Sequence, residues 1–328
     1  MPQHDHIDSV TRHLLCQEYG LGQILFVESL KGAHTKGFVV QTTTGKWVAR
    51  RRATRDSEPT RINFDHAALI FLARQGARVT SPCANRSGQR LLQSLGNVWE
   101  LFPYISGNSF EIGNQEMTIS LATELGKFHH IGQQFPGRFD KPAIPSEPNA
   151  PEVRRMAQQF FKAMPMLEPD EVPFMERIDA AEQDLVNASV AALPHTLIHG
   201  EVTPEHVLTR GAAVSGFVGY YAISWKPRVL DIAFALLHCC LIFEREPDDL
   251  LEFPQDNEGS AQRELVADFI NAYCTVAEPL SDRERISVNA LLSLHFSQRK
   301  LTEAAAARRE DRIAVFTGSP RSCHALFV

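Results

Sequence analysis

Residues 197–208 read LIHGEVTPEHVL, a polar stretch between two apolar pairs. The polar stretch carries imidazoles at His199 and His206 and carboxylates at Glu201 and Glu205. Loops between short strands commonly carry catalytic groups, because a rigid scaffold holds them in place. Since Glu201 and His206 are five residues apart, such a loop can bring both side chains toward one cation. The spacing alone also fits an ordinary surface turn with solvated charges, so the pattern leaves both interpretations open.

The residues after this loop predict a hairpin and then a helix. Residues 214–221 read VSGFVGYY, and residues 225–233 read WKPRVLDIA. We expect strands within residues 196–223 and a turn at residues 210–213, because short apolar runs around a glycine-containing turn are typical of hairpins. From about residue 229 the apolar pattern is helical.

The order of these motifs resembles the catalytic loop and metal strand of the aminoglycoside phosphotransferase, choline kinase and homoserine kinase superfamily. Its members typically show His-Gly-Asp, four residues and Asn, and then a hairpin whose second strand bears Ile-Asp-Phe-Asp. At the corresponding spacing this chain has His199-Gly200, Pro204, Val207-Leu208, Gly216, Pro227-Arg228 and Asp231-Ile232-Ala233. The resemblance implies an enzyme that transfers a phosphoryl group from ATP, with Mg²⁺, to the alcohol group of a small molecule.

The resemblance continues into the N-terminal half of the chain. The matching segments are Tyr19-Gly20-Leu21-Gly22, Leu30-Lys31-Gly32, Asp65-His66-Ala67-Ala68-Leu69, Leu101 to Gly107 and Leu125-Gly126-Lys127-Phe128-His129. They imply an α+β, bilobal, protein-kinase-like fold, with an antiparallel sheet and a helix in the N-terminal lobe and a mainly helical C-terminal lobe. We expect residues 1–103 to form the nucleotide lobe and residues 104–328 to form the helical lobe, which carries residues 197–231.

Local patterns predict the same kinds of element along the chain. The expected elements of the N-terminal lobe are a helix at 8–19, strands at 24–30, 38–42 and 47–50, a helix at 62–75, and strands at 91–93 and 98–102. Five prolines between residues 133 and 151 predict a long loop before the next helices.

The resemblance also implies which residues would contact a nucleotide. Arg50 falls where the phosphate-binding base lies, and Asp65 falls where its acidic partner lies. Such a pair is chemically sensible, because a guanidinium can bind a carboxylate through two hydrogen bonds. Gly32 lies in the turn after the first strand. At the hinge Pro103 has no backbone N–H, so the N–H of Tyr104 is left for adenine.

Four positions depart from the family pattern. Glu201 replaces the loop Asp, and a displacement of its carboxylate by on the order of 1 Å can cost about 10²-fold in rate while leaving it a base. His206 replaces the Asn and is the candidate metal ligand, as in macrolide-phosphotransferase-like members. Gly219 and Tyr221 replace the two strand acids, and neither ligates Mg²⁺ well.

These departures support two hypotheses on function. In the first, the chain is a pseudokinase, a repurposed or inactive phosphotransferase fold that binds a small molecule, with Tyr220 and Tyr221 lining the ligand cleft. In the alternative, it is an active ATP-dependent kinase that phosphorylates an aminoglycoside, macrolide, homoserine- or choline-like hydroxyl, with Glu201 as base. The first hypothesis makes ATP and Mg²⁺ dispensable, whereas the second requires both.

Other side chains in the loop region have simpler interpretations. His199 joins Glu201 as a candidate catalytic residue, although its imidazole can instead brace the loop by donating to backbone carbonyls. Asp231 is expected to be structural and to brace the loop through hydrogen bonds. A third hypothesis is a metal-dependent enzyme of another class that uses some of the histidines His4, His6, His129, His130, His199 and His206. Adjacent histidines such as His129 and His130 would point to different sides of a helix, which argues against shared ligation.

Composition limits the class of protein. The 328 residues are 44% hydrophobic and 22% charged, with a formal net charge of -6, which is typical of a globular protein and unlike a basic nucleic-acid-binding protein. The N-terminus has no apolar signal region, and the apolar residues 229–243 are too short to span a bilayer. Six cysteines without a CxxC pair indicate reduced thiols. We therefore expect a cytoplasmic protein with a small-molecule partner, no nucleic acid and no membrane. No motif indicates an oligomeric state.

Overall fold

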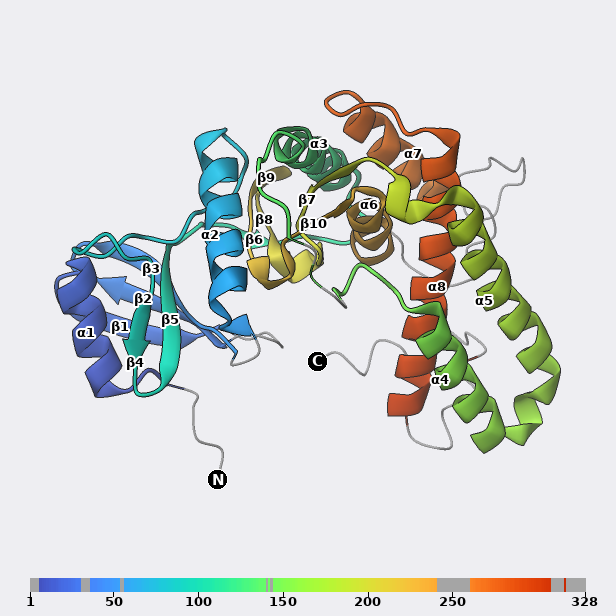
Figure 1. Cartoon of the computed structure of the whole chain (residues 1–328), viewed down its shortest axis with the longest axis horizontal. Helices are drawn as coiled ribbons and strands as arrows, with labels where there is room; N and C mark the ends of the chain where they lie inside the picture. Colours follow the sequence, from blue (N-terminus) through green and yellow to red (C-terminus); the bar gives the residue numbers. More distant parts are fainter. Residues whose placement is uncertain are drawn as a thin grey trace.

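The computed structural model describes residues 6–30, 36–53, 56–139, 141, 144–240, 260–307 and 316. Figure 1 shows an N-terminal lobe built on a sheet and a larger C-terminal lobe built mainly from helices. The predicted α+β architecture, with an antiparallel sheet and a helix followed by a helical lobe, is confirmed.

The N-terminal lobe holds a five-stranded antiparallel sheet of order β1-β2-β3-β5-β4. Its strands are β1 (Ile24–Ser29), β2 (Lys36–Thr42), β3 (Gly45–Arg51), β4 (Leu92–Ser94) and β5 (Asn97–Pro103). Helix α1 (Ser9–Tyr19) covers this sheet, since Leu15 is buried in one cluster with Phe38 and Trp99. Strands β1, β2 and β3 are neighbours in the order of the chain, whereas α2 and β4 lie between β3 and its other neighbour, β5.

Helix α2 (Pro59–Arg74) lies between the two lobes (Figure 1). It begins at Pro59 rather than at the predicted residue 62, because proline suits the first turn of a helix and the Glu58 carboxylate accepts from the N–H groups of Thr60 and Arg61. Its apolar face, with Leu69 and Leu72, is buried in the same cluster as side chains of the C-terminal lobe. Packing therefore joins α2 to both lobes.

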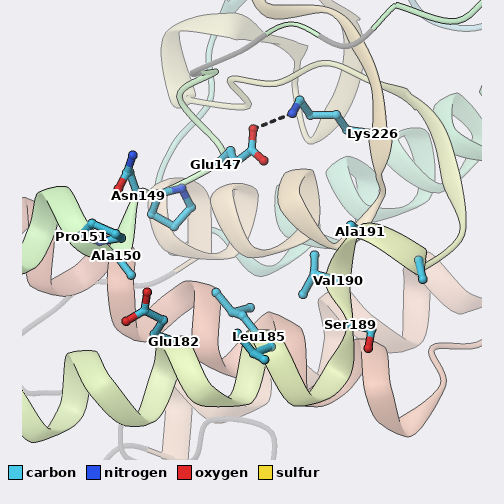
Figure 2. A pocket seen from close by; sticks show the side chains of 13 residues that line it. Glu147, Asn149, Ala150, Pro151, Glu182, Leu185, Ser189, Val190, Ala191 and Lys226 are labelled. Carbon is cyan, nitrogen blue, oxygen red and sulfur yellow. Dashed lines mark hydrogen bonds and ion pairs between the residues drawn. The ribbon is translucent and has the colours of Figure 1, made fainter.

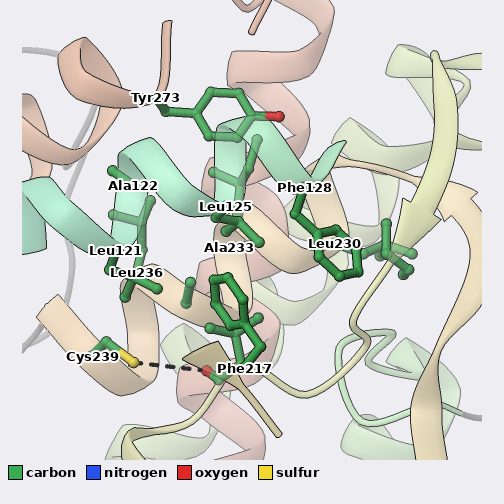
Figure 3. Close-up of a cluster of buried hydrophobic side chains, with 14 of the residues drawn as sticks. Leu121, Ala122, Leu125, Phe128, Phe217, Leu230, Ala233, Leu236, Cys239 and Tyr273 are labelled. Atoms are coloured by element: carbon green, nitrogen blue, oxygen red, sulfur yellow. Dashed lines mark hydrogen bonds between the residues drawn. The ribbon is translucent and has the colours of Figure 1, made fainter. Parts of the chain in front are cut away.

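The C-terminal lobe is built around buried helices. They are α3 (Gln115–Gly132), α4 (Ala150–Ala163), α5 (Glu168–Ala188), α6 (Val229–Ala235), α7 (Ser260–Cys274) and α8 (Asp282–Ala306). All residues of α6 are buried, and Leu230 and Ala233 pack near Phe128, Phe217 and Tyr273 (Figure 3). The predicted long loop lies between the end of α3 and the start of α4.

Two small sheets hold the segment that carries the motifs. Strand β7 (His195–Ile198) pairs with β10 (Ser224–Pro227), and β8 (Val207–Arg210) pairs with β9 (Ala213–Phe217). A short strand β6 (Asn108–Ser109), which the sequence did not predict, adds to β8. The loop of residues 199–206 thus connects the two sheets and is anchored at both ends. Among the described residues, none of the helices is both long enough and apolar enough to cross a bilayer.

Candidate functional site

Asp231 ties helix α6 to the loop of residues 199–206. One carboxylate oxygen accepts the backbone N–H of Gly200 at 2.7 Å, and the other accepts that of His199 at 2.6 Å. The Nε2–H of His129 donates to the second oxygen at 3.2 Å, and Asp231 is fully buried. Because a buried carboxylate must have hydrogen-bond partners, this geometry fixes the backbone of the loop.

His199 uses both ring nitrogens within the protein. Its Nε2–H donates to the carbonyl of Val218 at 2.7 Å, and its Nδ1 accepts the backbone N–H of Glu201 at 3.3 Å. Complete burial lowers the pKa of His199 to about 4, so the ring stays neutral near pH 7. With both nitrogens engaged, this side chain braces the loop and has no nitrogen directed at a ligand for proton transfer.

Glu201 and His206 lie close together, and they contact each other. Their spacing had suggested that both could approach one cation. The Nδ1–H of His206 donates to the backbone carbonyl of Glu201 at 2.9 Å. The same nitrogen lies 3.5 Å from the Glu201 carboxylate. Nδ1 of His206 therefore faces Glu201, and the edge of the ring that carries Nε2 faces Gly219.

Gly219 is the residue that the motif spacing matches to the family's strand Asp, and the His206 ring fills the space that a side chain at position 219 would occupy. A Cβ at position 219 would lie 2.5 Å from Nε2 of His206 and 2.7 Å from its Cγ. The backbone of Gly219 also has φ of +80°, in the left-handed region that favours glycine. The changes at positions 206 and 219 are therefore sterically coupled.

These residues do not fit a magnesium ion. Mg²⁺ requires near-octahedral oxygen coordination and usually one or two carboxylates. Here the strand position has no side chain, the loop position has an imidazole, and the neighbouring position has Tyr221. In the described part of the chain, no three His, Cys, Asp or Glu side chains are grouped so that they could hold a metal ion.

The two tyrosines of the hairpin occupy different environments. Tyr220 is only 3% exposed, its hydroxyl donates to the carbonyl of Phe217, and it accepts the N–H of Thr80 at 3.0 Å. The prediction that Tyr220 lines a ligand cleft is therefore wrong, because a single helical turn directs its ring into the core. Tyr221 is partly exposed, and its ring lies edge-on to His206 with centroids 6.4 Å apart.

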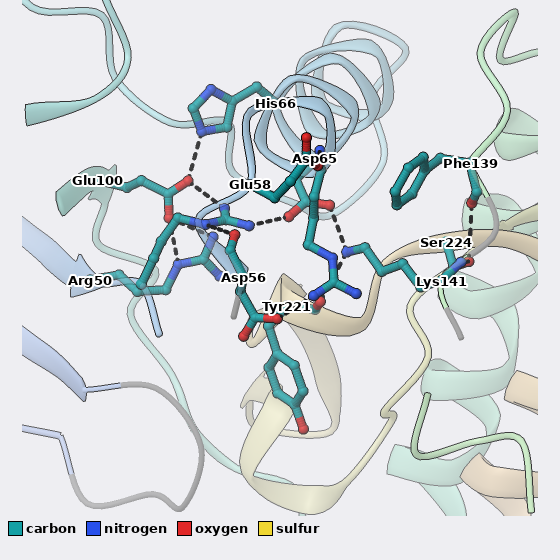
Figure 4. Close-up of polar contacts among 12 residues, drawn as sticks. Arg50, Asp56, Glu58, Asp65, His66, Glu100, Phe139, Lys141, Tyr221 and Ser224 are labelled. Carbon is teal, nitrogen blue, oxygen red and sulfur yellow. Dashed lines mark hydrogen bonds and ion pairs between the residues drawn. The ribbon is translucent and has the colours of Figure 1, made fainter. Parts of the chain in front are cut away.

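The ion pairs of the N-terminal lobe differ from the predicted ones (Figure 4). Arg50 pairs with Glu100, with Nε 2.8 Å from the carboxylate, whereas Asp65 pairs with Arg52 at 2.6 Å. The expected Arg50–Asp65 pair is wrong, because Glu100 lies directly opposite Arg50 in the β3–β5 register and reaches it first. Arg52 lies two residues further on and points to the same face.

Glu100 is the centre of this buried group. Besides Arg50, it binds Arg52 at 2.8 Å and accepts from His66 Nε2 at 2.7 Å. Burial acts to raise the pKa of Glu100, but Arg50, His66 and Arg52 together outweigh burial and hold that pKa well below its ordinary value. Arg50, the base expected to bind phosphate, thus has Glu100 and not Asp65 as its acidic partner.

The hinge is also engaged within the protein. The backbone N–H of Tyr104, which was the candidate donor to adenine, donates to the carbonyl of Lys46 at 3.3 Å. The ammonium of Lys46 lies 3.9 Å from the centre of the Tyr104 ring. Gly32, the fourth residue predicted to contact nucleotide, lies outside the described residues.

A separate cavity of about 970 Å³ lies in the C-terminal lobe (Figure 2). It opens between the start of α4 and the end of α5, and an ion pair of 2.6 Å between Lys226 and Glu147 lies at its edge. Among the described residues that line it, none belongs to the loop of residues 199–206. This cavity is therefore not formed by the predicted catalytic loop.

Comparison with known proteins agrees with the fold. A model of the phosphotransferase enzyme family matches residues 28–286. The homoserine kinase of Beijerinckia indica subsp. indica is 24% identical over 251 residues, which cover 76% of this chain and 74% of the relative. The homoserine kinase of Neisseria meningitidis serogroup B is 24% identical over 282 residues, which cover 85% and 87%.

Solved structures share the architecture at low sequence identity. An amicoumacin kinase matches with a TM-score of 0.69 and 13% identity, over 95% of this chain and 91% of that one. An aminoglycoside phosphotransferase from Alicyclobacillus acidocaldarius matches with a TM-score of 0.67 and 15% identity, over 97% and 93%. These matches confirm the protein-kinase-like fold that the motifs implied. The chain belongs to the phosphotransferase enzyme family.

Proposed function

We propose that this protein is a repurposed kinase fold, which binds a small molecule and does not carry out magnesium-dependent phosphoryl transfer. The observation that carries the proposal is the His206 ring packed against Gly219, at the position of the family's metal-binding acid. Phosphoryl transfer in kinases is mostly positioning and charge neutralisation, and the metal ions supply much of the neutralisation. A site that holds an imidazole instead of a carboxylate lacks this contribution.

The nucleotide side of the cleft supports the same proposal. The backbone N–H of Tyr104, the candidate donor to adenine, is bound to the carbonyl of Lys46. Adenine would have to displace this carbonyl before it gained the hydrogen bond. We therefore expect nucleotide affinity to be low and independent of Mg²⁺.

The alternative is an active ATP-dependent kinase acting on an alcohol group. It is favoured by the names of the relatives, which are homoserine kinases, and by Glu201, whose carboxylate remains in the loop as a possible base. In this alternative the reaction would proceed with a reduced set of metal ligands.

Calorimetric titration with ATP separates the two functions. We expect no heat of binding up to millimolar ATP, and the same result with and without Mg²⁺. The alternative predicts Mg²⁺-dependent binding and a phosphorylated product when homoserine is added, detected by mass spectrometry and lost in Glu201→Ala. Detection of that product would reject the proposed function.

Restoring the strand acid tests the steric coupling itself. Gly219→Asp is expected to destabilise the protein by about 1–3 kcal/mol, the usual cost of overpacking, because its Cβ meets the His206 ring. The matched control is Gly211→Asp, whose φ of +58° is also left-handed but whose Cβ meets nothing within 4 Å. His206→Asn combined with Gly219→Asp should recover the stability of the control.

The same double variant should acquire a response to metal. Its carboxylate and amide oxygens are suitable ligands for Mg²⁺. We expect Mg²⁺ with ADP to raise the melting temperature of the double variant and not that of the wild type. If Gly219→Asp is as stable as Gly211→Asp, the His206 ring does not prevent an aspartate from being accommodated at position 219.

A further inference from the structure

Lys141 reaches from the C-terminal lobe into the interface between the lobes. It lies in the loop between α3 and α4, and its side chain is almost completely buried. Its ammonium lies 2.6 Å from the Asp65 carboxylate and donates to the carbonyl of Tyr221 at 2.9 Å (Figure 4). Its backbone N–H donates to Ser224 Oγ at 3.2 Å, which fixes the loop on the C-terminal lobe.

The partner of Lys141 belongs to the N-terminal lobe. Asp65 is a fully buried residue of α2, and its second oxygen binds Arg52 at 2.6 Å. The neighbouring Phe64 packs on two rings of the same loop, Phe135 at 5.8 Å and Phe139 at 5.4 Å between centroids. Ionic and aromatic contacts therefore join α2 to the loop at one place.

Burying the Lys141 ammonium costs desolvation free energy, which an apolar side chain at this position would not cost. Burial lowers the pKa of Lys141 to about 8, although Asp65 acts to raise it, so the side chain remains mostly protonated at neutral pH. A buried ion pair contributes little net stability compared with apolar side chains, and in some proteins it serves instead to fix one relative arrangement of its partners. We therefore expect the Lys141–Asp65 contact to affect the relative arrangement of the lobes more than the free energy of unfolding.

In a working kinase the nucleotide phosphates and their metal ions contact residues of both lobes and so bridge them. We propose that Lys141 supplies a bridge of this kind from within the chain, as a latch that ties α2 to the C-terminal lobe and holds the two lobes in one arrangement without a ligand. This inference goes beyond the proposed function and does not depend on it, since a latch could serve an active or an inactive kinase fold.

The contacts also make the latch releasable. If the lobes separate, Asp65 keeps its ion pair with Arg52, which belongs to the same lobe. Lys141 returns to water, where its charge is favourably hydrated. Opening therefore leaves no unpaired buried charge, which is the situation that makes rupture of a buried ion pair so costly.

The latch can be tested by measuring the distance between the lobes. Spin labels on ketone-bearing unnatural residues at Val10 in α1 and Val186 in α5, both exposed, report this distance by double electron–electron resonance in the full chain. We expect Lys141→Met to shift the mean distance by roughly 2 Å or more, the scale of domain rearrangements, or to add a second population. The matched control is Lys127→Met, which removes a surface pair with Glu124 and should leave the distribution unchanged.

The result that would overturn the latch is a distance distribution in Lys141→Met that superimposes on that of the wild type. If Lys141→Met does not fold, as judged by circular dichroism, Lys141→Gln removes the charge while keeping a donor, and the same two outcomes apply to it. Nucleotide titration of these variants is a separate measurement, so failure of the latch and failure of the proposed function remain distinguishable.

Discussion

Asp231→Ala is expected to cost roughly 3–9 kcal/mol in the free energy of unfolding, because it leaves two buried backbone N–H groups and His129 without their acceptor. Each buried polar group left without a partner costs about 1–3 kcal/mol. The total stability of a domain is only about 5–15 kcal/mol, so the variant should be close to unfolding at room temperature. Urea denaturation followed by circular dichroism measures the difference.

Two other variants make this prediction specific. Asp231→Asn keeps the shape and an acceptor oxygen, and it should lose clearly less stability than Asp231→Ala. Asp268→Ala removes a carboxylate from α7 that accepts a hydrogen bond from Gln115 at the surface, and it should cost less than about 1 kcal/mol. If Asp231→Ala and Asp268→Ala are equally stable, Asp231 does not brace the loop.

Mild acid is expected to destabilise the protein strongly through its buried histidines. Burial lowers the pKa of His199 and of His295 to about 4 and that of His238 to about 3, below the ordinary value of 6.5. The unfolded chain therefore takes up protons first as the pH falls. The stability that these neutral rings contribute is fully present above pH 6.5 and is lost as the pH falls toward 4. For His199 and His295, a shift of the pKa from 6.5 to about 4 corresponds to roughly 3 kcal/mol each.

Comparing urea denaturation at pH 7 and pH 5 isolates the histidines, because ordinary carboxyl groups titrate below this range. In His295→Gln we expect the loss of stability between the two pH values to be smaller by about 2 kcal/mol than in the wild type. His130→Gln, at an exposed position of α3, is the matched control and should show the wild-type loss. Equal losses in both variants would contradict the prediction for His295.

Much of the fold could be predicted from the sequence because its signals are local. The runs at β1, β2 and β3 are short and separated in the sequence by glycine-containing segments, so a meander was the simplest arrangement. The spacing between His199 and Asp231 placed a loop, a hairpin and a helix in the observed order. The start of α2 and the two-residue strand β6 were less predictable, because capping and a single pair of residues leave little trace in a hydrophobic pattern.

The details of the site could not be predicted because they depend on contacts between distant segments. Arg50 pairs with Glu100 and not with Asp65 because the register of β3 and β5 places Arg50 opposite Glu100. Lys141 comes from an irregular loop with no periodicity, so nothing in the sequence connected it with Asp65. For the same reason the sequence marked Gly219 and His206 as two separate departures, although their atoms compete for one volume.

The packing of His206 against Gly219 restricts the order in which these positions can change over evolutionary time. An ancestor with Asn and Asp at the two sites could lose the acid first and gain the imidazole afterwards. If the acid at 219 were regained first, its side chain would clash with the His206 ring. If His206 were first replaced by a smaller residue, the intermediate would have only a small void. A relative that carries both an imidazole at 206 and an acid at 219 should therefore hold the ring in a different position from the one that His206 has here.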